Sequence, residues 1–232
     1  MISRSIKILS EDVVSRIAAG EVVERPASVV KELLENSIDS GASAIHIYVM
    51  GGGLEAITVV DNGCGIDSSD VSMAFTRFAT SKIVTFDDLE RIGSLGFRGE
   101  ALYSISSVSE LTVITKTSRD DVGTKAVVNN GELVSHGAVA SNQGTLVTVS
   151  GLFKNFPARK KFLKSSVSES GRIRSLVQKY AMICPSISFD LRQDIGRNFM
   201  TSGSGDLRYV MGAIYGQEFA SDMIAIPRIH SE

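Results

Sequence analysis

Residues 28–39 carry an apolar stripe with the spacing of a helix that turns one face toward a core. Its apolar positions recur at i, i+3, i+4 and i+8, and they are Val30, Leu33, Leu34 and Ile38. The opposite face carries Glu32, Asn36 and Asp39. A carboxylate and an amide one turn apart can converge on one point in space. This polar face is therefore either an ordinary solvated surface or one wall of a site.

Alternation with period two and a β-rich composition predict strands in the middle of the chain. We expect strands at 45–50, 56–61, 110–117, 125–129, 132–138, 144–151 and 188–192. Helical patterns predict further helices at 10–19, 68–79, 100–107, 172–183 and 206–215. Because helices come early and strands cluster in the middle, the pattern favours an α+β two-layer sandwich with a mixed sheet.

These elements predict one domain over 1–204 and the start of another. Residues 1–20 form an N-terminal arm of the first domain in this prediction. The pattern restarts at 205 with a new helix, so we interpret 205–232 as the truncated opening of a second domain.

The composition narrows the class of protein. Of 232 residues, 43% are hydrophobic and 22% are charged, as in an ordinary globular protein with a sizeable core. The net charge of −2 argues against a wholesale nucleic-acid coat but permits a local basic patch. Two distant cysteines and three scattered histidines predict neither a disulfide framework nor a zinc site. No apolar run approaches the roughly 18 residues of a membrane span, so we expect an intracellular protein without membrane contact.

Asp61 ends a predicted buried strand and is followed by the tight turn Asn62-Gly63-Cys64-Gly65. An aspartate at a strand end is placed to accept hydrogen bonds from a ligand, and the glycines allow a flat ring to approach the backbone. The alternative is a plain turn, because Asn-Gly is a common turn dipeptide.

Residues 80–99 are polar, punctuated by glycines and longer than an ordinary connection, which indicates a functional loop. The stretch 93–102, which overlaps the end of this loop, has a glycine every three residues and runs directly into a predicted helix. Such a loop presents unpaired N–H groups that can bind phosphate, and Arg98 adds a positive charge. A flexible surface loop is the alternative. Neither GxxxxGK[ST] nor GxGxxG occurs, so a P-loop or a Rossmann site is not available.

Together these motifs resemble those of the GHKL ATPases and, within them, the MutL mismatch-repair family. The four superfamily motifs match, in order, Glu32 with Asn36, Asp61 with Gly63 and Gly65, the segment 93–102, and Gly144 with Thr145. Three stretches are similar to MutL rather than to gyrase, heat-shock chaperone or histidine-kinase relatives, namely 18–32, 96–102 and 156–163. The departures are Ser40, where the family usually has alanine, and Tyr103, where a small residue is common.

The resemblance implies a Bergerat-type sandwich with a largely antiparallel sheet, ATP as the ligand and Mg²⁺ as the cofactor. It implies that Glu32 is the general base for the attacking water, that Asn36 binds magnesium, and that Asp61 accepts the adenine amino group with support from Thr145. Asp39 is left with a structural role, and 80–102 would close as a lid over the phosphates. The implied nucleotide-binding residues are Asn36, Asp61, Gly65, Lys82, Gly96, Phe97, Arg98, Gly99, Ala101, Leu102 and Thr145.

A basic segment follows the last of these motifs. Residues 157–179 hold seven basic side chains against one acidic side chain, a local charge of +6. A solvated helix face is the usual interpretation, but the family signature nearby makes contact with the DNA backbone plausible. The candidate DNA-binding residues are Arg159, Lys160, Lys161 and Lys164.

By resemblance, we expect a slow ATPase of DNA mismatch repair in which nucleotide binding orders the lid and drives homodimerisation of the full protein. Expected partners are DNA, mismatch-recognition proteins and downstream repair proteins, in the bacterial cytoplasm near the nucleoid. A lysine that the family supplies from its second domain lies beyond Glu232, which implies weak activity of this region alone. The alternatives are phosphotransfer of the histidine-kinase type and a nucleotide-gated DNA clamp that does not hydrolyse ATP.

Overall fold

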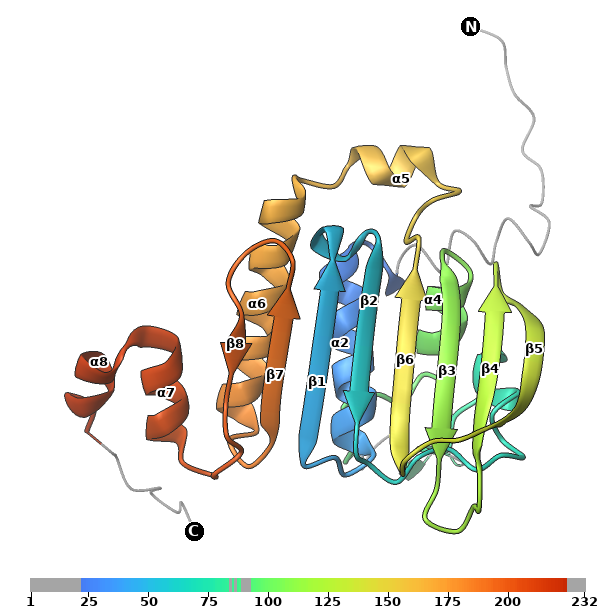
Figure 1. Cartoon of the computed structure of the whole chain (residues 1–232), viewed down its shortest axis with the longest axis horizontal. Coiled ribbons are helices and arrows are strands. Elements are labelled where there is room, and N and C mark those ends of the chain that lie inside the picture. Colours follow the sequence, from blue (N-terminus) through green and yellow to red (C-terminus); the bar gives the residue numbers. More distant parts are fainter. Residues whose placement is uncertain (1–21, 84, 86, 89–92, 225–232) are drawn as a thin grey trace, which may run out of the picture.

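One sheet of eight strands runs through the molecule in the order β5-β4-β3-β6-β2-β1-β7-β8 (Figure 1). The computed structural model describes residues 22–83, 85, 87–88 and 93–224. The strands are β1 (Ala44–Met50), β2 (Ala56–Asp61), β3 (Glu110–Lys116), β4 (Gly123–Asn129), β5 (Glu132–Val139), β6 (Gly144–Ser150), β7 (Ser188–Gln193) and β8 (Phe199–Met200). Only β1 and β7 pair in parallel among these strands, so the expected mixed, largely antiparallel sheet is confirmed.

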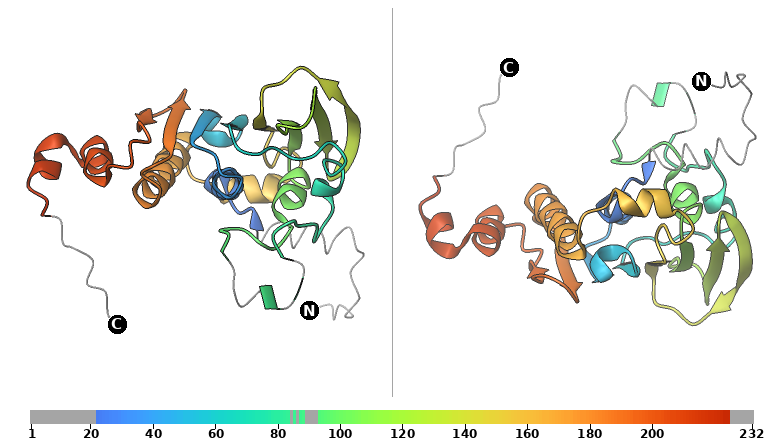
Figure 2. Two further views of the ribbon diagram at one scale, coloured as in Figure 1. Left: turned by 90° about the horizontal axis from the view of Figure 1, so that it is seen from below. Right: turned by 90° about the horizontal axis from the view of Figure 1, so that it is seen from above.

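The long helices lie on one face of this sheet. The helices are α2 (Pro26–Asp39), α4 (Ala101–Ser106), α5 (Pro157–Lys161), α6 (Ser166–Ile183), α7 (Leu207–Tyr215) and α8 (Gln217–Ser221), with short 3-10 helices η1 (Gly51–Gly53) and η2 (Met73–Phe75). Figure 2 shows α2, α4 and α6 on the same side of the strands. The predicted α+β two-layer sandwich is therefore confirmed. No helix in the described ranges is long and apolar enough to cross a membrane.

The core lies between the helical layer and the inner face of the sheet. Alternate side chains of the central strands point inward and are buried, among them Ile45, Ile47, Val49, Ile57, Val59, Leu111, Val113 and Val149. The helices contribute Val29, Val30, Leu33 and Leu34 from α2, and Ile173, Val177 and Ala181 from α6. A slip of one residue would turn a strand's apolar set outward, and each such side chain contributes about 1.5–3 kcal/mol when buried. The core therefore sets the strand register, which also decides which polar residues meet at the strand ends.

Two helix boundaries differ from the sequence-based expectation. Helix α2 begins at Pro26, because proline fits the first turn, where its missing N–H is not needed. Helix α6 begins at Ser166 rather than at 172, and the Ser165 hydroxyl caps it by accepting a hydrogen bond from the Ser168 N–H at 3.3 Å. The short elements α5 and β8 were not predicted. The helix expected at 10–19 lies outside the described residues.

The helix predicted at 68–79 is wrong, because this segment forms turns and the single 3-10 turn η2. The Asp67 carboxylate accepts hydrogen bonds from both the backbone N–H and the hydroxyl of Ser69, at 3.0 and 2.8 Å. Side chains of this kind offer the backbone an alternative to the helical hydrogen bonds. Later in the segment, Phe78 has a φ of 65°, which a helix cannot contain.

The predicted helix after 205 is present as α7. Figure 1 shows α7 and α8 beyond the β8 edge of the sheet. Val210 of α7 is buried in the main core, and Ile214 packs against it. Apolar contacts thus join α7 to the main core. The assignment of 205–232 to a second domain stays a prediction.

Candidate nucleotide-binding site

Polar residues from four elements meet at one end of the sheet, the lower end in Figure 1. Helix α2 and strand β2 both end there, β3 also ends there, and β6 begins there. The register aligns Asp61 of β2 with Thr145 of β6, and Thr145 with Thr115 of β3. The strand order therefore brings together residues that are far apart in the sequence.

Asp61 is held by three hydrogen bonds. Its Oδ2 accepts from the Ser37 hydroxyl of α2 at 2.8 Å, and its Oδ1 accepts from the backbone N–H groups of Gly63 at 2.9 Å and Thr145 at 3.3 Å. Burial raises the pKa of this carboxyl group above its usual value, although the three hydrogen bonds oppose the shift. The site thus presents a fixed, partly desolvated carboxylate suited to accept a hydrogen bond from a neutral donor.

Two glycines permit the close approach of strands around Asp61. Gly144 has a φ of 116°, and a Cβ there would collide with the Asp61 carbonyl. Gly65 has a φ of 75°, and a Cβ there would collide with the Lys116 carbonyl. Both positions combine a left-handed backbone with no room for a side chain, so only glycine fits.

Thr115 supports the same corner, and sequence reasoning missed it. Its hydroxyl accepts from the Ile66 N–H at 2.8 Å and lies 3.1 Å from the Thr145 hydroxyl and 3.2 Å from the Gly144 carbonyl. The side chain is 1% exposed. A threonine at an inward position of an otherwise apolar strand was the signal that could have revealed it. Ser37 was missed too, because only the β2 contact gives it a partner.

The polar face of α2 lies beside this corner. Glu32 and Asn36 lie one turn apart and are both partly exposed, as the helical spacing predicts. The Asn36 side-chain oxygen accepts from Lys82 Nζ at 3.0 Å. The Glu32 carboxylate accepts from Lys31 Nζ at 3.2 Å. Both oxygens therefore face cationic groups.

Asp39 anchors the glycine-rich segment to the end of α2. Its carboxylate accepts from the backbone N–H groups of Leu95 at 2.9 Å and Gly96 at 3.1 Å, and from Lys82 Nζ at 2.5 Å. Burial disfavours the charged form of Asp39, but the hydrogen bonds from Lys82, Leu95 and Gly96 outweigh it and lower the pKa. We call this cluster the Asp39 latch. It occupies the Gly96 N–H, which was expected to face phosphate.

The remaining residues of the predicted loop are placed by contacts of their own. The Arg98 guanidinium lies 5.7 Å from the centre of the Phe97 ring. Gly99 lies against the backbone of Ala79. Ala101 and Leu102 begin α4, next to Glu100, which accepts from Arg77 Nε at 2.9 Å. The structure thus brings Asp61 together with Thr145, and Asn36 with Lys82, whereas 97–102 makes the separate contacts just described.

This geometry agrees with the comparisons of the chain with known proteins. Residues 24–149 match the family described as histidine kinase-, DNA gyrase B-, and HSP90-like ATPases. The chain is 48% identical over 221 residues to the DNA mismatch repair protein MutL of Desulforudis audaxviator, and 50% identical over 221 residues to that of a Geobacillus species. The chain belongs to the MutL family of GHKL ATPases. The family resemblance drawn from the motifs is thereby confirmed.

Solved MutL structures share the fold. The Aquifex aeolicus MutL ATPase domain complexed with ADP is 31% identical, with a TM-score of 0.69, and the match covers 84% of this chain and 70% of that one. The N-terminal domain of a DNA repair protein is 35% identical, with a TM-score of 0.75, covering 90% and 62%. The chain spans only 39% and 36% of the two curated MutL relatives named above. It corresponds to their N-terminal ATPase region.

The basic segment of this MutL-family chain lies at the other end of the sheet, where α5 crosses above the strands in Figure 1. Lys160, Lys161 and Lys164 are exposed. Arg159 is partly buried, which lowers its pKa, and its guanidinium lies 5.3 Å from the centre of the Phe156 ring. Three of the four predicted DNA-binding side chains thus extend into solvent, far from Asp61.

Buried Glu169 ties this segment to the body of the molecule. Its carboxylate is 0% exposed, and its Oε1 accepts from the Lys164 N–H at 3.3 Å. Arg25 Nη1, beside the start of α2, and Arg172 Nε lie 3.8 and 3.9 Å away. The carboxylate therefore fixes the end of the basic segment at the point where α6 begins.

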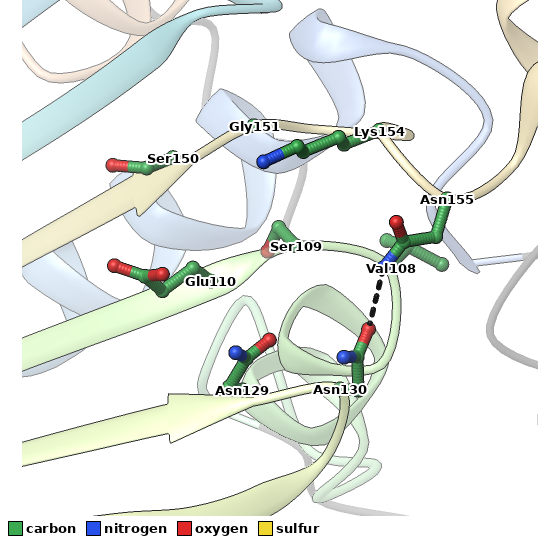
Figure 3. A pocket seen from close by; sticks show the side chains of 9 residues that line it. All are labelled: Val108, Ser109, Glu110, Asn129, Asn130, Ser150, Gly151, Lys154 and Asn155. Atoms are coloured by element: carbon green, nitrogen blue, oxygen red, sulfur yellow. Dashed lines mark hydrogen bonds between the residues drawn. The ribbon is translucent and has the colours of Figure 1, made fainter.

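A polar depression of about 240 Å³ lies at the same end of the sheet (Figure 3). It is lined by Val108, Ser109, Glu110, Asn129, Asn130, Ser150, Gly151, Lys154 and Asn155. The Asn155 side chain donates to Asn130 Oδ1 at 3.2 Å, and Figure 3 shows the Lys154 side chain extending toward Ser150. None of the predicted nucleotide-binding residues lines it. Two of its lining residues, Lys154 and Asn155, come just before α5 in the chain.

Proposed function

We propose that this chain binds ATP and, in the full-length protein, hydrolyses it slowly with magnesium. The observation that supports this most is the half-buried Asp61 carboxylate, held by three hydrogen bonds beside the polar face of α2. The similar Aquifex aeolicus MutL ATPase domain is complexed with ADP, which supports the choice of nucleotide.

In this proposal, Asp61 accepts a hydrogen bond from the exocyclic amino group of adenine. Guanine has a carbonyl at that position, so a carboxylate would favour adenine over guanine. Thr145 supports Asp61 through its backbone N–H, and Gly65 lets the turn after Asp61 pack directly against the backbone of Lys116. Because these groups are held by the sheet, base recognition needs little rearrangement.

Glu32 is the proposed general base. It would accept a proton as water attacks the γ-phosphorus in line with the bond to the leaving ADP. The segment 96–102 would supply backbone N–H groups to the phosphate oxygens, with Lys82 and Arg98 adding positive charge. For Gly96 to do so, its N–H must leave Asp39. We infer that the Asp39 latch opens when phosphate binds.

The oxygens around Lys82 fit a magnesium ion. Asn36 Oδ1 and Asp39 Oδ2 both lie within hydrogen-bond distance of the same ammonium group, so they converge on one cationic position. No cluster of three or more His, Cys, Asp or Glu side chains suited to a metal occurs among the described residues. This suits magnesium, which takes few protein ligands and relies on phosphate and water. Magnesium held by Asn36 would neutralise charge on the phosphate oxygens.

We further propose that ATP binding drives homodimerisation of the full-length protein, and that mismatch-recognition and downstream repair proteins are its partners. DNA would bind through Lys160, Lys161 and Lys164, with Arg159 beside them and the depression around Lys154 continuing the surface. Such contacts go to phosphate and are independent of sequence. The proposed location is the bacterial cytoplasm, in contact with the nucleoid.

The histidine-kinase alternative is not favoured, because the identity to MutL proteins extends over 95% of the chain. One substitution distinguishes the proposed ATPase from a clamp that binds nucleotide without hydrolysing it. Glu32→Ala in the full-length protein should keep nucleotide binding, measured by calorimetry, and reduce phosphate release to a residual rate. Unchanged turnover in this variant would rule out Glu32 as the base, and absence of turnover in the parent protein would favour the clamp.

The DNA proposal has its own test. Reversing the charge at Lys160 and Lys161 should weaken DNA binding and flatten its dependence on salt concentration. Lys125, an exposed lysine on β4, offers a matched control. Equal loss of affinity in Lys125→Glu would show that general charge, and not this surface, binds DNA.

A further inference from the structure

A chain of polar contacts runs from the buried interface of α2 and α6 to Glu32. The Tyr180 hydroxyl on α6 donates to Glu35 Oε1 at 2.5 Å. Glu35 Oε2 accepts from Lys31 Nζ at 2.8 Å, and the same ammonium donates to Glu32 Oε1 at 3.2 Å. Each link joins a different pair of atoms, so the four side chains form one continuous path.

The inner end of this path is rigid. Tyr180 is 8% exposed and Glu35 is 7% exposed, between the apolar side chains of two long helices. Burial raises the pKa of Tyr180 further above its usual value, and the hydrogen bond to Glu35 adds to the effect. Tyr180 therefore stays a neutral donor at any physiological pH. It fixes one oxygen of Glu35 and leaves the other for Lys31.

Lys31 links this rigid pair to the carboxylate of Glu32. Glu32 and Glu35 lie on the same helix, one turn apart, so their negative charges repel each other. An ammonium group that contacts both carboxylates offsets that repulsion and limits the rotamers available to Glu32. Burial opposes the charge on Lys31, but its contacts with Glu35 and Glu32 outweigh it and raise the pKa. Because the lysine side chain is 45% exposed, the pair with Glu32 contributes little to stability.

We propose that Lys31 is a positioning residue that holds Glu32 Oε1 and so directs Oε2 toward the attacking water. This rests on the proposed function, in which Glu32 is the general base. In that reaction the water oxygen forms a bond to the γ-phosphorus, and the water proton passes to Glu32 Oε2. The bond from the γ-phosphorus to the bridging oxygen breaks, and its electron pair leaves with ADP.

A purely structural role for Lys31 would show as a loss of stability, whereas positioning affects the chemical step. Misplacement of a base by about 1 Å can cost up to a hundredfold in rate without weakening ground-state binding. Lys31→Met removes the charge and keeps the length of the side chain. In the full-length protein we expect kcat to fall by about tenfold with KM for ATP nearly unchanged. Lys31→Arg should recover more than half of kcat, because it restores a donor to both carboxylates.

Three further variants complete the experiment. Lys125→Met is the matched control and should leave kcat unchanged. Tyr180→Phe keeps the ring but removes the donor to Glu35, and should lower kcat by a smaller factor of about two to three. In a Glu32→Ala background, where only residual turnover remains, Lys31→Met should have no further effect, because it acts through Glu32.

The outcomes separate the positioning role from the proposed function itself. Unchanged kcat in Lys31→Met overturns the positioning role. So does a fall in kcat that Lys31→Arg fails to reverse, or one matched by a lower melting temperature or a higher KM. If Glu32→Ala itself keeps full turnover, the base assignment fails instead, whatever Lys31→Met does.

Discussion

The two sides of the proposed nucleotide site are held by different kinds of contact. On the adenine side, Asp61 accepts from residues of α2, the following turn and β6, all of which belong to the sandwich. On the phosphate side, the segment beginning at 93 is held through Asp39 and Lys82, by side-chain contacts at the end of α2. One side is built by the core, and the other by contacts that a ligand can replace.

The difference explains how binding can be both selective and switchable. Phosphate oxygens and the Asp39 carboxylate are both anionic acceptors, so in the proposed site they would compete for the Gly96 N–H and for Lys82. Binding of the base needs no such exchange. In the proposed site, a preformed corner would select adenine, while the phosphates would supply the free energy that shifts the loop. Substitutions on the two sides should accordingly have separate effects.

The largest effect is expected at Asp61. Asp61→Ala removes the acceptor for the adenine amino group and leaves the Ser37 hydroxyl and two N–H groups without their partner. We expect the affinity for ATP, measured by calorimetry, to fall by roughly a hundredfold. Undiminished affinity would show that the base binds elsewhere.

A second prediction concerns the Asp39 latch. Asp39→Asn removes the negative charge that attracts Lys82 and the N–H groups of Leu95 and Gly96. Amide hydrogen exchange at Leu95 and Gly96 should become about tenfold faster, while exchange at Gly63 and Thr145 stays as it was. If all four amides changed together, the two sides would not be independent.

A smaller effect is expected at Thr115, which supports the adenine side from beneath. Thr115→Val keeps the shape but leaves the partly buried Ile66 N–H without its acceptor. We expect the free energy of unfolding, from denaturant titration, to fall by about 1–3 kcal/mol. ATP affinity should drop by about fivefold, because Thr145 loses a neighbour that orients it. Thr112→Val, at a partly exposed position of the same strand, is the control.

The smallest effect is a dependence on pH. The raised pKa of Asp61 means that, as pH falls, this carboxyl group takes up a proton before an ordinary aspartate does, and it then loses an acceptor for adenine. Because the pKa of Asp61 is higher in the folded protein than in the unfolded chain, this group stabilises the fold at low pH. The stabilisation is complete below the pKa of the unfolded state and is lost as pH rises through the pKa of the folded state. Asp39 has a lowered pKa, so the stability from its latch is present at neutral pH and is lost only in stronger acid.

Mild acidification should therefore weaken adenine binding by about two- to threefold before it affects the latch. Calorimetry with adenosine, which lacks phosphate, isolates this effect. Asp61→Asn should remove the dependence on pH. A dependence that persists in Asp61→Asn would point to a different titrating group.

The sequence pattern predicted those parts of the candidate site that lie on regular helices and strands. Helix α2 has a clear apolar stripe, so the sequence predicted which of its residues lie on the polar face. Asp61 and Thr145 were found because they belong to family motifs at strand ends. The bonds from Ser37 to Asp61 and from Lys82 to Asp39 could not be foreseen, because they join residues whose proximity depends on the packed sheet and loop. The error at 68–79 has a local cause, the Asp67 side chain, which competes with helical hydrogen bonds.

The parallel pairing of β1 with β7 has a consequence for how the chain folds during synthesis. Strands β1 to β6 follow one another within the first part of the chain, whereas Ala44 of β1 pairs with Ser188 of β7. A nascent chain can therefore form most of the sheet while β1 is still an unpaired edge strand. The face of α2 that packs against α6 stays exposed to solvent until α6 has been synthesised. Chains released before β7 would expose that edge to other chains and aggregate. The earlier part of this region is thus protected from aggregation only after β7, in its last quarter, has been synthesised.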